Sequence, residues 1–118
     1  MEIKIAIQGI QGSFHHQVAH RYFGEAIGLD ECATFRDVAN SLKNNQSDKA
    51  IMAIENSIAG AILPNYSLID SYDLHIIGEH FLDIHMNLMV LPGQTIEDIK
   101  EVHSHPIALL QCANFFSQ

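Results

Sequence analysis

The apolar positions of the chain follow two different spacings, and the change from one to the other predicts strands and helices in turn. Residues 3–8 form a short β-branched run that ends at Gly9, which is typical of a buried strand. Residues 14–24 then carry apolar side chains at spacings of three and four, which predicts an amphipathic helix. Ser13 is its expected N-cap, and a glycine is its expected end.

The same alternation continues into the middle of the chain. A second amphipathic helix is predicted over residues 33–45, and a second buried strand over residues 49–54. Pro64 suits the first turn of a further helix through residues 65–72, because proline lacks the N–H that an early helical position leaves unpaired. This order of strand, helix and strand predicts an α/β fold.

The second half of the chain gives weaker signals. Two extended segments are predicted within 74–91, interrupted near 78–81. A short helix capped by Thr95 is predicted over 96–100, followed by a short strand over 101–104. A final helix is predicted to start at Pro106 and to run over 107–118. The final helix has no glycine, proline or basic last turn to end it, so we expect the chain to be cut short.

Composition and charge narrow the classes of function. The 118 residues include six basic and fourteen acidic side chains, and a net charge of -8 argues against a nucleic-acid partner. No apolar run approaches the ~18 residues of a membrane span, and the N-terminus does not resemble a signal peptide. We therefore expect a cytoplasmic globular protein without a membrane partner. Cys32 and Cys112 stand alone in the sequence, which predicts reduced thiols.

Two motifs near the N-terminus have both a functional and a structural interpretation. The turn GIQGSF lacks the glycine spacing of a dinucleotide site and the lysine of a P-loop, so it is either a tight strand-to-helix turn or a helix N-terminus that binds a carboxylate. His16 and His20 have the spacing of a helical zinc pair. Gln17 stands where a metalloprotease has glutamate, and no third ligand is apparent, so a solvent-facing helix is preferred.

Two polar clusters are candidates for a binding site. Glu55, Asn56 and Ser57 come after the predicted strand 49–54, and open α/β sheets bind ligands at the carboxyl ends of their strands. Their amide and hydroxyl groups are able to donate to an anion, although an N-cap and turn would use the same residue types. Ser104 and Gln111 present the same choice near Pro106.

Three stretches together carry a resemblance to a known family. GIQGSFHHQVA, AIENSIAGAI and HSHPIALLQC occur in the order of three signature regions of the prephenate dehydratase family, and the chain resembles its catalytic domain. The resemblance implies an α/β fold of the two-lobed, periplasmic-binding-protein-like (type II) architecture. Residues 1–83 would form the first lobe, and residues 84–118 a crossing strand and the beginning of the second lobe. The remainder of that lobe and any ACT regulatory domain would be absent.

The resemblance also implies a site and a reaction. The residues implied to bind prephenate are Glu55, Asn56 and Ser57 from the first lobe, Ser104 and Gln111 from the second, and Gly12 and Ser13 near the substrate at a helix N-terminus. Prephenate would lose water and carbon dioxide to give phenylpyruvate, a step of phenylalanine biosynthesis, and neither a cofactor nor a metal would be needed.

The chain departs from the family pattern in one feature that bears on chemistry. The family's Thr-Arg-Phe motif, implied to supply the acid, is absent, so no catalytic residue is assigned and the chain alone is expected to be inactive. A non-catalytic module that binds a small anion in the same two-lobed fold is the alternative. A purely structural domain would leave both polar clusters unexplained. Strands missing from the sheet would leave an open edge, which favours a homo-oligomer.

Overall fold

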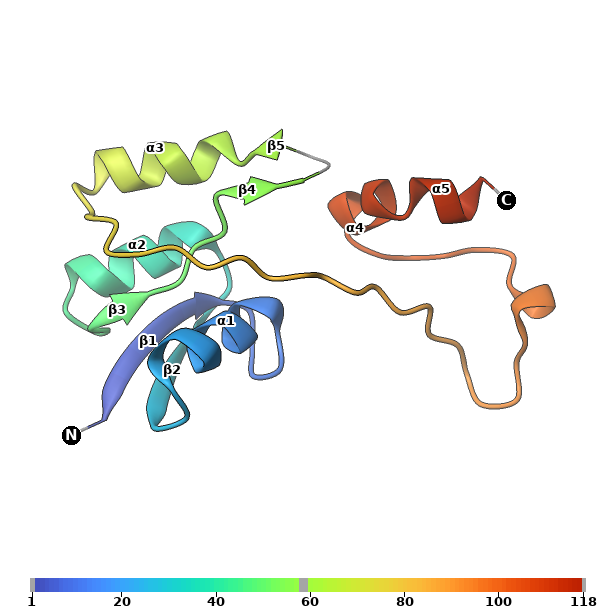
Figure 1. Cartoon of the computed structure of the whole chain (residues 1–118), viewed down its shortest axis with the longest axis horizontal. Coiled ribbons are helices and arrows are strands. Elements are labelled where there is room, and N and C mark those ends of the chain that lie inside the picture. Colours follow the sequence, from blue (N-terminus) through green and yellow to red (C-terminus); the bar gives the residue numbers. More distant parts are fainter. Residues whose placement is uncertain (1, 58–59, 118) are drawn as a thin grey trace.

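The computed structural model describes residues 2–57 and 60–117. The strands are β1 (Ile3–Gln8), β2 (Ile27–Cys32), β3 (Lys49–Ala50), β4 (Glu55–Asn56) and β5 (Gly60–Ala61). The helices are α1 (Phe14–Phe23), α2 (Phe35–Lys43), α3 (Leu63–Ser71), α4 (Pro106–Gln111) and α5 (Ala113–Phe116), with a 3-10 turn at Ile96–Asp98. Figure 1 shows the sheet with α1, α2 and α3 around it, and a long irregular segment that leads away to α4 and α5.

A parallel sheet of three strands in the order β2-β1-β3 forms the centre of the fold. β1 pairs with β2 along its whole length, from Ile3 opposite Ile27 to Gln8 opposite Cys32. The crossover through α1 returns the chain to one side of β1, and the crossover through α2 carries it to the other side. With right-handed crossovers, the two helices must cover opposite faces of the sheet. The α/β prediction is confirmed.

The core lies on both faces of β1. Ile5 and Ile7 have no exposed surface and pack against Ala19 of α1. Ala6, which points to the opposite face, packs against Val38 of α2 and is equally buried. Burying an isoleucine side chain stabilises a fold by about 1.5–3 kcal/mol. The predicted first strand is therefore the element that holds both helices in place.

The predicted helix starts in the first half of the chain are confirmed. The Ser13 hydroxyl oxygen accepts from the His16 N–H at 3.2 Å and caps α1, which ends at Gly24. The Thr34 hydroxyl, which was not predicted as a cap, caps α2 in the same way, and α3 begins with Pro64 in its first turn, as predicted. These signals are local, so the sequence alone is enough to read them.

Two strand predictions for this half were incomplete. β2 was not predicted, since its sequence IGLDEC holds a glycine and two acids, yet it pairs with β1 over six residues. The strand expected over 49–54 is regular only at Lys49–Ala50. The Ile51 N–H still donates to the Ala6 carbonyl at 3.0 Å, after which the chain leaves the sheet. The polar cluster that follows is therefore separated from the sheet by a short irregular segment.

The predictions for the second half were largely wrong. Residues 74–91 and 101–104 form no strand, the helix expected over 96–100 is a single 3-10 turn, and the final helix is broken at Cys112 into α4 and α5. A strand needs a partner for its N–H and C=O groups, and the described residues offer these segments none. Within the described ranges, no helix is long and apolar enough to cross a membrane.

Candidate functional site

The strand order defines where a ligand site is expected. The crossovers from β1 to β2 and from β2 to β3 run on opposite faces, so the switch point of the sheet lies between β1 and β3. The carboxyl end of β1 continues into the turn Gly9–Ser13, and that of β3 continues toward Glu55. Parallel strands end at one edge, so both predicted segments of the first lobe follow the same edge of the sheet (Figure 1).

The second of these segments is a small hairpin rather than the end of a long strand. β4 pairs antiparallel with β5, with Glu55 opposite Ala61 and Asn56 opposite Gly60. Glu55 is exposed, Asn56 is half-buried, and Ser57 is exposed in the turn that follows β4. The prediction that this cluster directly follows a buried strand was wrong, because the chain leaves the sheet before it reaches Glu55.

The hairpin is anchored by a residue that the sequence reading did not single out. The Asn65 amide on α3 donates to the Ala53 carbonyl at 2.7 Å, and its side chain is almost completely buried. The Ile62 N–H donates to the Ile54 carbonyl at 2.8 Å, which closes the base of the hairpin. The only signal in the sequence is an asparagine directly after the proline that starts the helix, and it is a weak one. These bonds fix the direction in which Glu55 and Asn56 leave the fold.

Ser104 and Gln111 lie in a different part of the molecule. Ser104 is exposed and lines a groove of about 870 Å³ between the irregular segment 86–104 and the helices α4 and α5. Gln111 is half-buried at the end of α4, whose main contacts are with α5. None of the described hairpin residues, 55–57 and 60–61, lines this groove. The structure therefore does not bring this pair together with Glu55 and Asn56.

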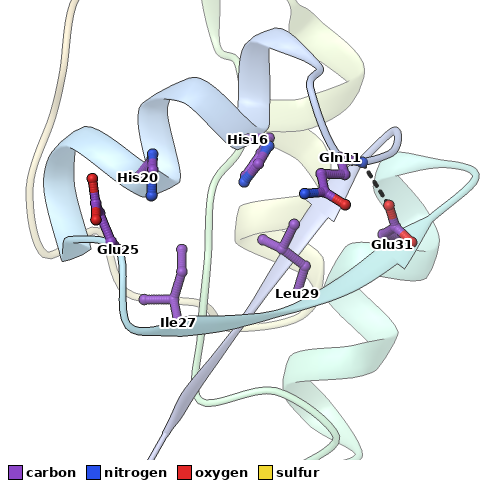
Figure 2. Close-up of a pocket in the computed structure, with 7 residues that line it drawn as sticks. All are labelled: Gln11, His16, His20, Glu25, Ile27, Leu29 and Glu31. Carbon is purple, nitrogen blue, oxygen red and sulfur yellow. Dashed lines mark hydrogen bonds between the residues drawn. The ribbon is translucent and has the colours of Figure 1, made fainter.

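The first turn lies beside a smaller groove of about 400 Å³ on the α1 face of β2 (Figure 2). Its floor is apolar, and its rim carries imidazole, carboxylate and amide groups. The lining residues are Gln11, His16, His20, Glu25, Ile27, Leu29 and Glu31. His20 is exposed, as predicted for a solvent-facing helix, but His16 is half-buried. Among the described residues, no group of three or more potential ligands is arranged to hold a metal ion.

Burial shifts the pKa of two side chains, His15 and Cys32, near the carboxyl ends of the strands. His15 packs edge-on against Phe35 with ring centroids 5.3 Å apart, and its buried Nε2 has no hydrogen-bond partner within the described part of the chain. Burial therefore lowers the pKa of His15, because the charged ring would lose its hydration. Burial, followed by the charges of Asp30 and Asp37, raises the pKa of the Cys32 thiol. Both cysteines are free, as predicted.

Comparison with known proteins gives consistent matches. The family model described as prephenate dehydratase matches residues 5–118. A bifunctional chorismate mutase/prephenate dehydratase of Buchnera aphidicola is 37% identical over 114 residues, covering 93% of this chain and 29% of the relative. The Arabidopsis thaliana protein named arogenate dehydratase/prephenate dehydratase 2 is 34% identical over 112 residues, covering 95% and 29%.

A solved structure supports the same relationship. The X-ray structure of prephenate dehydratase from Streptococcus mutans matches with a TM-score of 0.54 and 32% sequence identity, over 58% of this chain and 35% of that one. The Escherichia coli bifunctional enzyme of the same name as the Buchnera relative is 36% identical over 119 residues, covering 98% of this chain. The chain spans less than a third of the length of the curated relatives it matches, between 26% and 31%.

Proposed function

The chain belongs to the prephenate dehydratase family, and we propose that it forms part of the prephenate-binding site of an enzyme that makes phenylpyruvate. The observation that carries the proposal is the position of the family's first two signature stretches. They follow β1 and β3, the strands on either side of the switch point, where open α/β sheets bind their ligands.

The residue types at this edge suit a dianionic substrate. Asn56, Ser57 and Ser13 supply amide and hydroxyl donors, and a hydrogen bond to a charged group contributes about 1.5–3 kcal/mol. Gly12 keeps the approach to Ser13 open. The carboxylate of Glu55 would repel a substrate carboxylate, so we assign it to the ring hydroxyl, which is able to donate to it.

The reaction needs orientation and one proton. When the bond between the ring and its carboxylate breaks, carbon dioxide leaves and the electron pair of that bond enters the ring. The carbon–oxygen bond on the opposite ring carbon then breaks, and a proton converts the departing hydroxide into water. Aromaticity drives the reaction, so binding groups contribute mainly by holding the dianion in the reactive geometry. The chain has no Thr-Arg step, and we assign the acid to none of its residues.

We further propose the two-lobed type II architecture, with residues 1–83 as the first lobe and 84–118 as the crossing segment and the beginning of the second. The β2-β1-β3 order and the separate position of α4 and α5 support this division (Figure 1). In a closed cleft of this kind, Ser104 and Gln111 would approach the substrate from the second lobe.

The remaining features of the proposal concern partners and location. The net charge of -8 supports a protein that binds neither nucleic acid nor anionic membrane surfaces. A cytoplasmic location is part of the same proposal. The outer edge of β2 is unpaired in the described part of the chain, which supports a homo-oligomer. A monomeric mass by light scattering would contradict that last part.

The test is phenylpyruvate formation from prephenate by the complete product of the gene, with the 118-residue chain and a blank without protein in parallel. We expect turnover well above the blank from the complete product and none from the chain alone. Turnover by the chain would mean that a sufficient acid lies within it. Prephenate binding without product from either protein would support the alternative, a solute-binding module. Arogenate is tested in parallel as a second substrate, with phenylalanine as the measured product, because some relatives are named arogenate dehydratases.

A further inference from the structure

Four backbone N–H groups of the turn between β1 and α1 donate to acceptors within the chain, at distances of 2.6 to 3.0 Å. The bonds are Gly9 to the Cys32 carbonyl (2.9 Å), Gln11 to the Glu31 carboxylate (2.6 Å), Gly12 to Nδ1 of His16 (2.7 Å) and Ser13 to the Ile10 carbonyl (3.0 Å). An anion-binding turn needs N–H groups that point outward, so these four are not available to a substrate.

His16 holds two successive residues of the turn. Its Nδ1 accepts from the Gly12 N–H, and its own backbone N–H donates to the Ser13 hydroxyl oxygen at 3.2 Å. A neutral imidazole that accepts at Nδ1 carries its proton on Nε2. That ring nitrogen is then a donor and not a metal ligand, which is a physical reason why the spacing of His16 and His20 does not make a zinc pair.

Glu31 holds the turn from the opposite side. It lies near the end of β2, and its carboxylate accepts from the Gln11 N–H at 2.6 Å. Bonds to a charged acceptor are stronger than bonds between neutral groups. Figure 2 shows Gln11 between His16 on α1 and Glu31 on β2, so the turn is fixed by the helix that follows it and by the neighbouring strand.

These contacts decide which group the turn offers to a ligand. The Ser13 oxygen accepts from the His16 N–H, and its hydroxyl proton remains able to donate. We propose that His16 and Glu31 are positioning residues that hold the turn so that the Ser13 hydroxyl, and none of these four backbone amides, donates to an anionic oxygen of the substrate. The proposal rests on the proposed function, because prephenate is the source of that oxygen.

The first experiment tests the contacts without substrate. In the ¹⁵N-labelled chain, NMR of the ring nitrogens is expected to show His16 with its proton on Nε2. Amide exchange of Gly12 is expected to rise roughly fivefold in His16→Leu, the effect of one ordinary hydrogen bond. His16→Asn, which keeps an acceptor near the position of Nδ1, should restore slow exchange. His20→Leu, one turn further along α1, is the matched control.

Glu31 is tested in the same way through Gln11. Glu31→Leu should accelerate exchange of the Gln11 amide roughly tenfold or more, since the acceptor is charged, and Glu31→Gln should recover part of the protection. Equal Gly12 exchange in His16→Leu and His20→Leu, or a His16 proton on Nδ1, would overturn the role of His16. Unchanged Gln11 exchange in Glu31→Leu would overturn that of Glu31.

The second experiment tests the role of Ser13 in the complete gene product. Ser13→Ala is expected to raise KM for prephenate roughly 10- to 100-fold with little change in kcat, which is the pattern of a lost binding contact. His16→Leu should raise KM less, and Ser13→Ala with His16→Leu should be no worse than Ser13→Ala alone, because His16 acts through Ser13. His16→Asn should recover the KM.

Additive effects of the two substitutions, or a fall in kcat alone, would contradict this assignment. If the complete product neither binds nor converts prephenate, the proposed function and the role of Ser13 both fail. The exchange measurements do not use prephenate, so they would still decide whether His16 and Glu31 hold the turn.

Discussion

Substituting Gly9 by alanine is the perturbation that most directly joins the fold to the site. Gly9 has a φ of +109°, a conformation that side chains rarely adopt, and a Cβ at this position would lie 3.2 Å from Cβ and 3.3 Å from Oγ of Ser13. Gly24, at the end of α1, has a φ of +89° and no atom within 4 Å of the same added carbon. Gly24→Ala therefore introduces the backbone strain without the contact.

The two substitutions are expected to differ by the cost of that contact. A residue held in an unfavourable backbone region costs about 1–3 kcal/mol, and the lower entropy of the unfolded chain returns about 0.4–1 kcal/mol. Crowding a packed position costs about 1–3 kcal/mol more. At the midpoints of these ranges, Gly24→Ala should lower the free energy of unfolding by about 1 kcal/mol and Gly9→Ala by about 3 kcal/mol.

The assay is urea unfolding of both variants followed by circular dichroism, together with KM for prephenate in the complete gene product. Gly9→Ala should also raise KM, because Ser13 has to move away from the added methyl group, whereas Gly24→Ala should leave KM unchanged. Equal stability losses with an unchanged KM for both variants would refute the reasoning that Gly9 makes room for Ser13.

Three further predictions concern stability and reactivity. The folded-state pKa of His15 lies below its unfolded value, so the folded chain binds fewer protons and loses stability as the pH falls through the interval between the two values. His15→Phe should lessen this loss between about pH 7.5 and about pH 5, measured by urea unfolding at each pH. Equal losses in the unsubstituted chain and in His15→Phe would contradict the prediction. The Asp30 carboxylate accepts from the hydroxyls of Ser41 and Ser47, which are 2% and 7% exposed. Asp30→Ala should therefore lower the free energy of unfolding in urea by about 2–3 kcal/mol, and Asp30→Asn by less. A loss below about 0.5 kcal/mol for Asp30→Ala would contradict this role of Asp30. Cys112 should react with a thiol reagent faster than buried Cys32 in the folded chain and at a similar rate in urea, and equal rates in the folded chain would count against the raised pKa of the Cys32 thiol.

The elements that could be predicted are those set by local chemistry. Ser13 and Thr34 cap their helices through hydroxyls that reach N–H groups three residues later. Residues 5–7, the apolar centre of the run 3–8, are buried on both faces of the sheet, as their apolar composition indicates. β2 was missed because its two acids interrupt the apolar pattern of a buried strand. In the structure Asp30 is paired with hydroxyls on α2 and in the turn that follows α2, while Ile27 and Leu29 face α1.

The candidate site divides in the same way. Ser13 and the cluster at Glu55 could be found from motifs and from the expected ends of strands. The contact between Glu31 and Gln11 depends on the register that sets Ile7 opposite Glu31, and no spacing along the sequence reveals that register. The strand expected over 101–104 failed for a related reason, since strand formation depends on a neighbour that the pattern of one segment does not specify.

The most direct test of the account is a titration of the ¹⁵N-labelled chain with prephenate, followed through its backbone amides. If the carboxyl ends of β1 and β3 form one binding site, the signals of Ser13 and Asn56 should shift together and saturate with a single dissociation constant, while that of Gly93, in the irregular segment, should not move. Shifts confined to the segment 86–116, or none at millimolar prephenate, would contradict the placement of the site at this edge of the sheet.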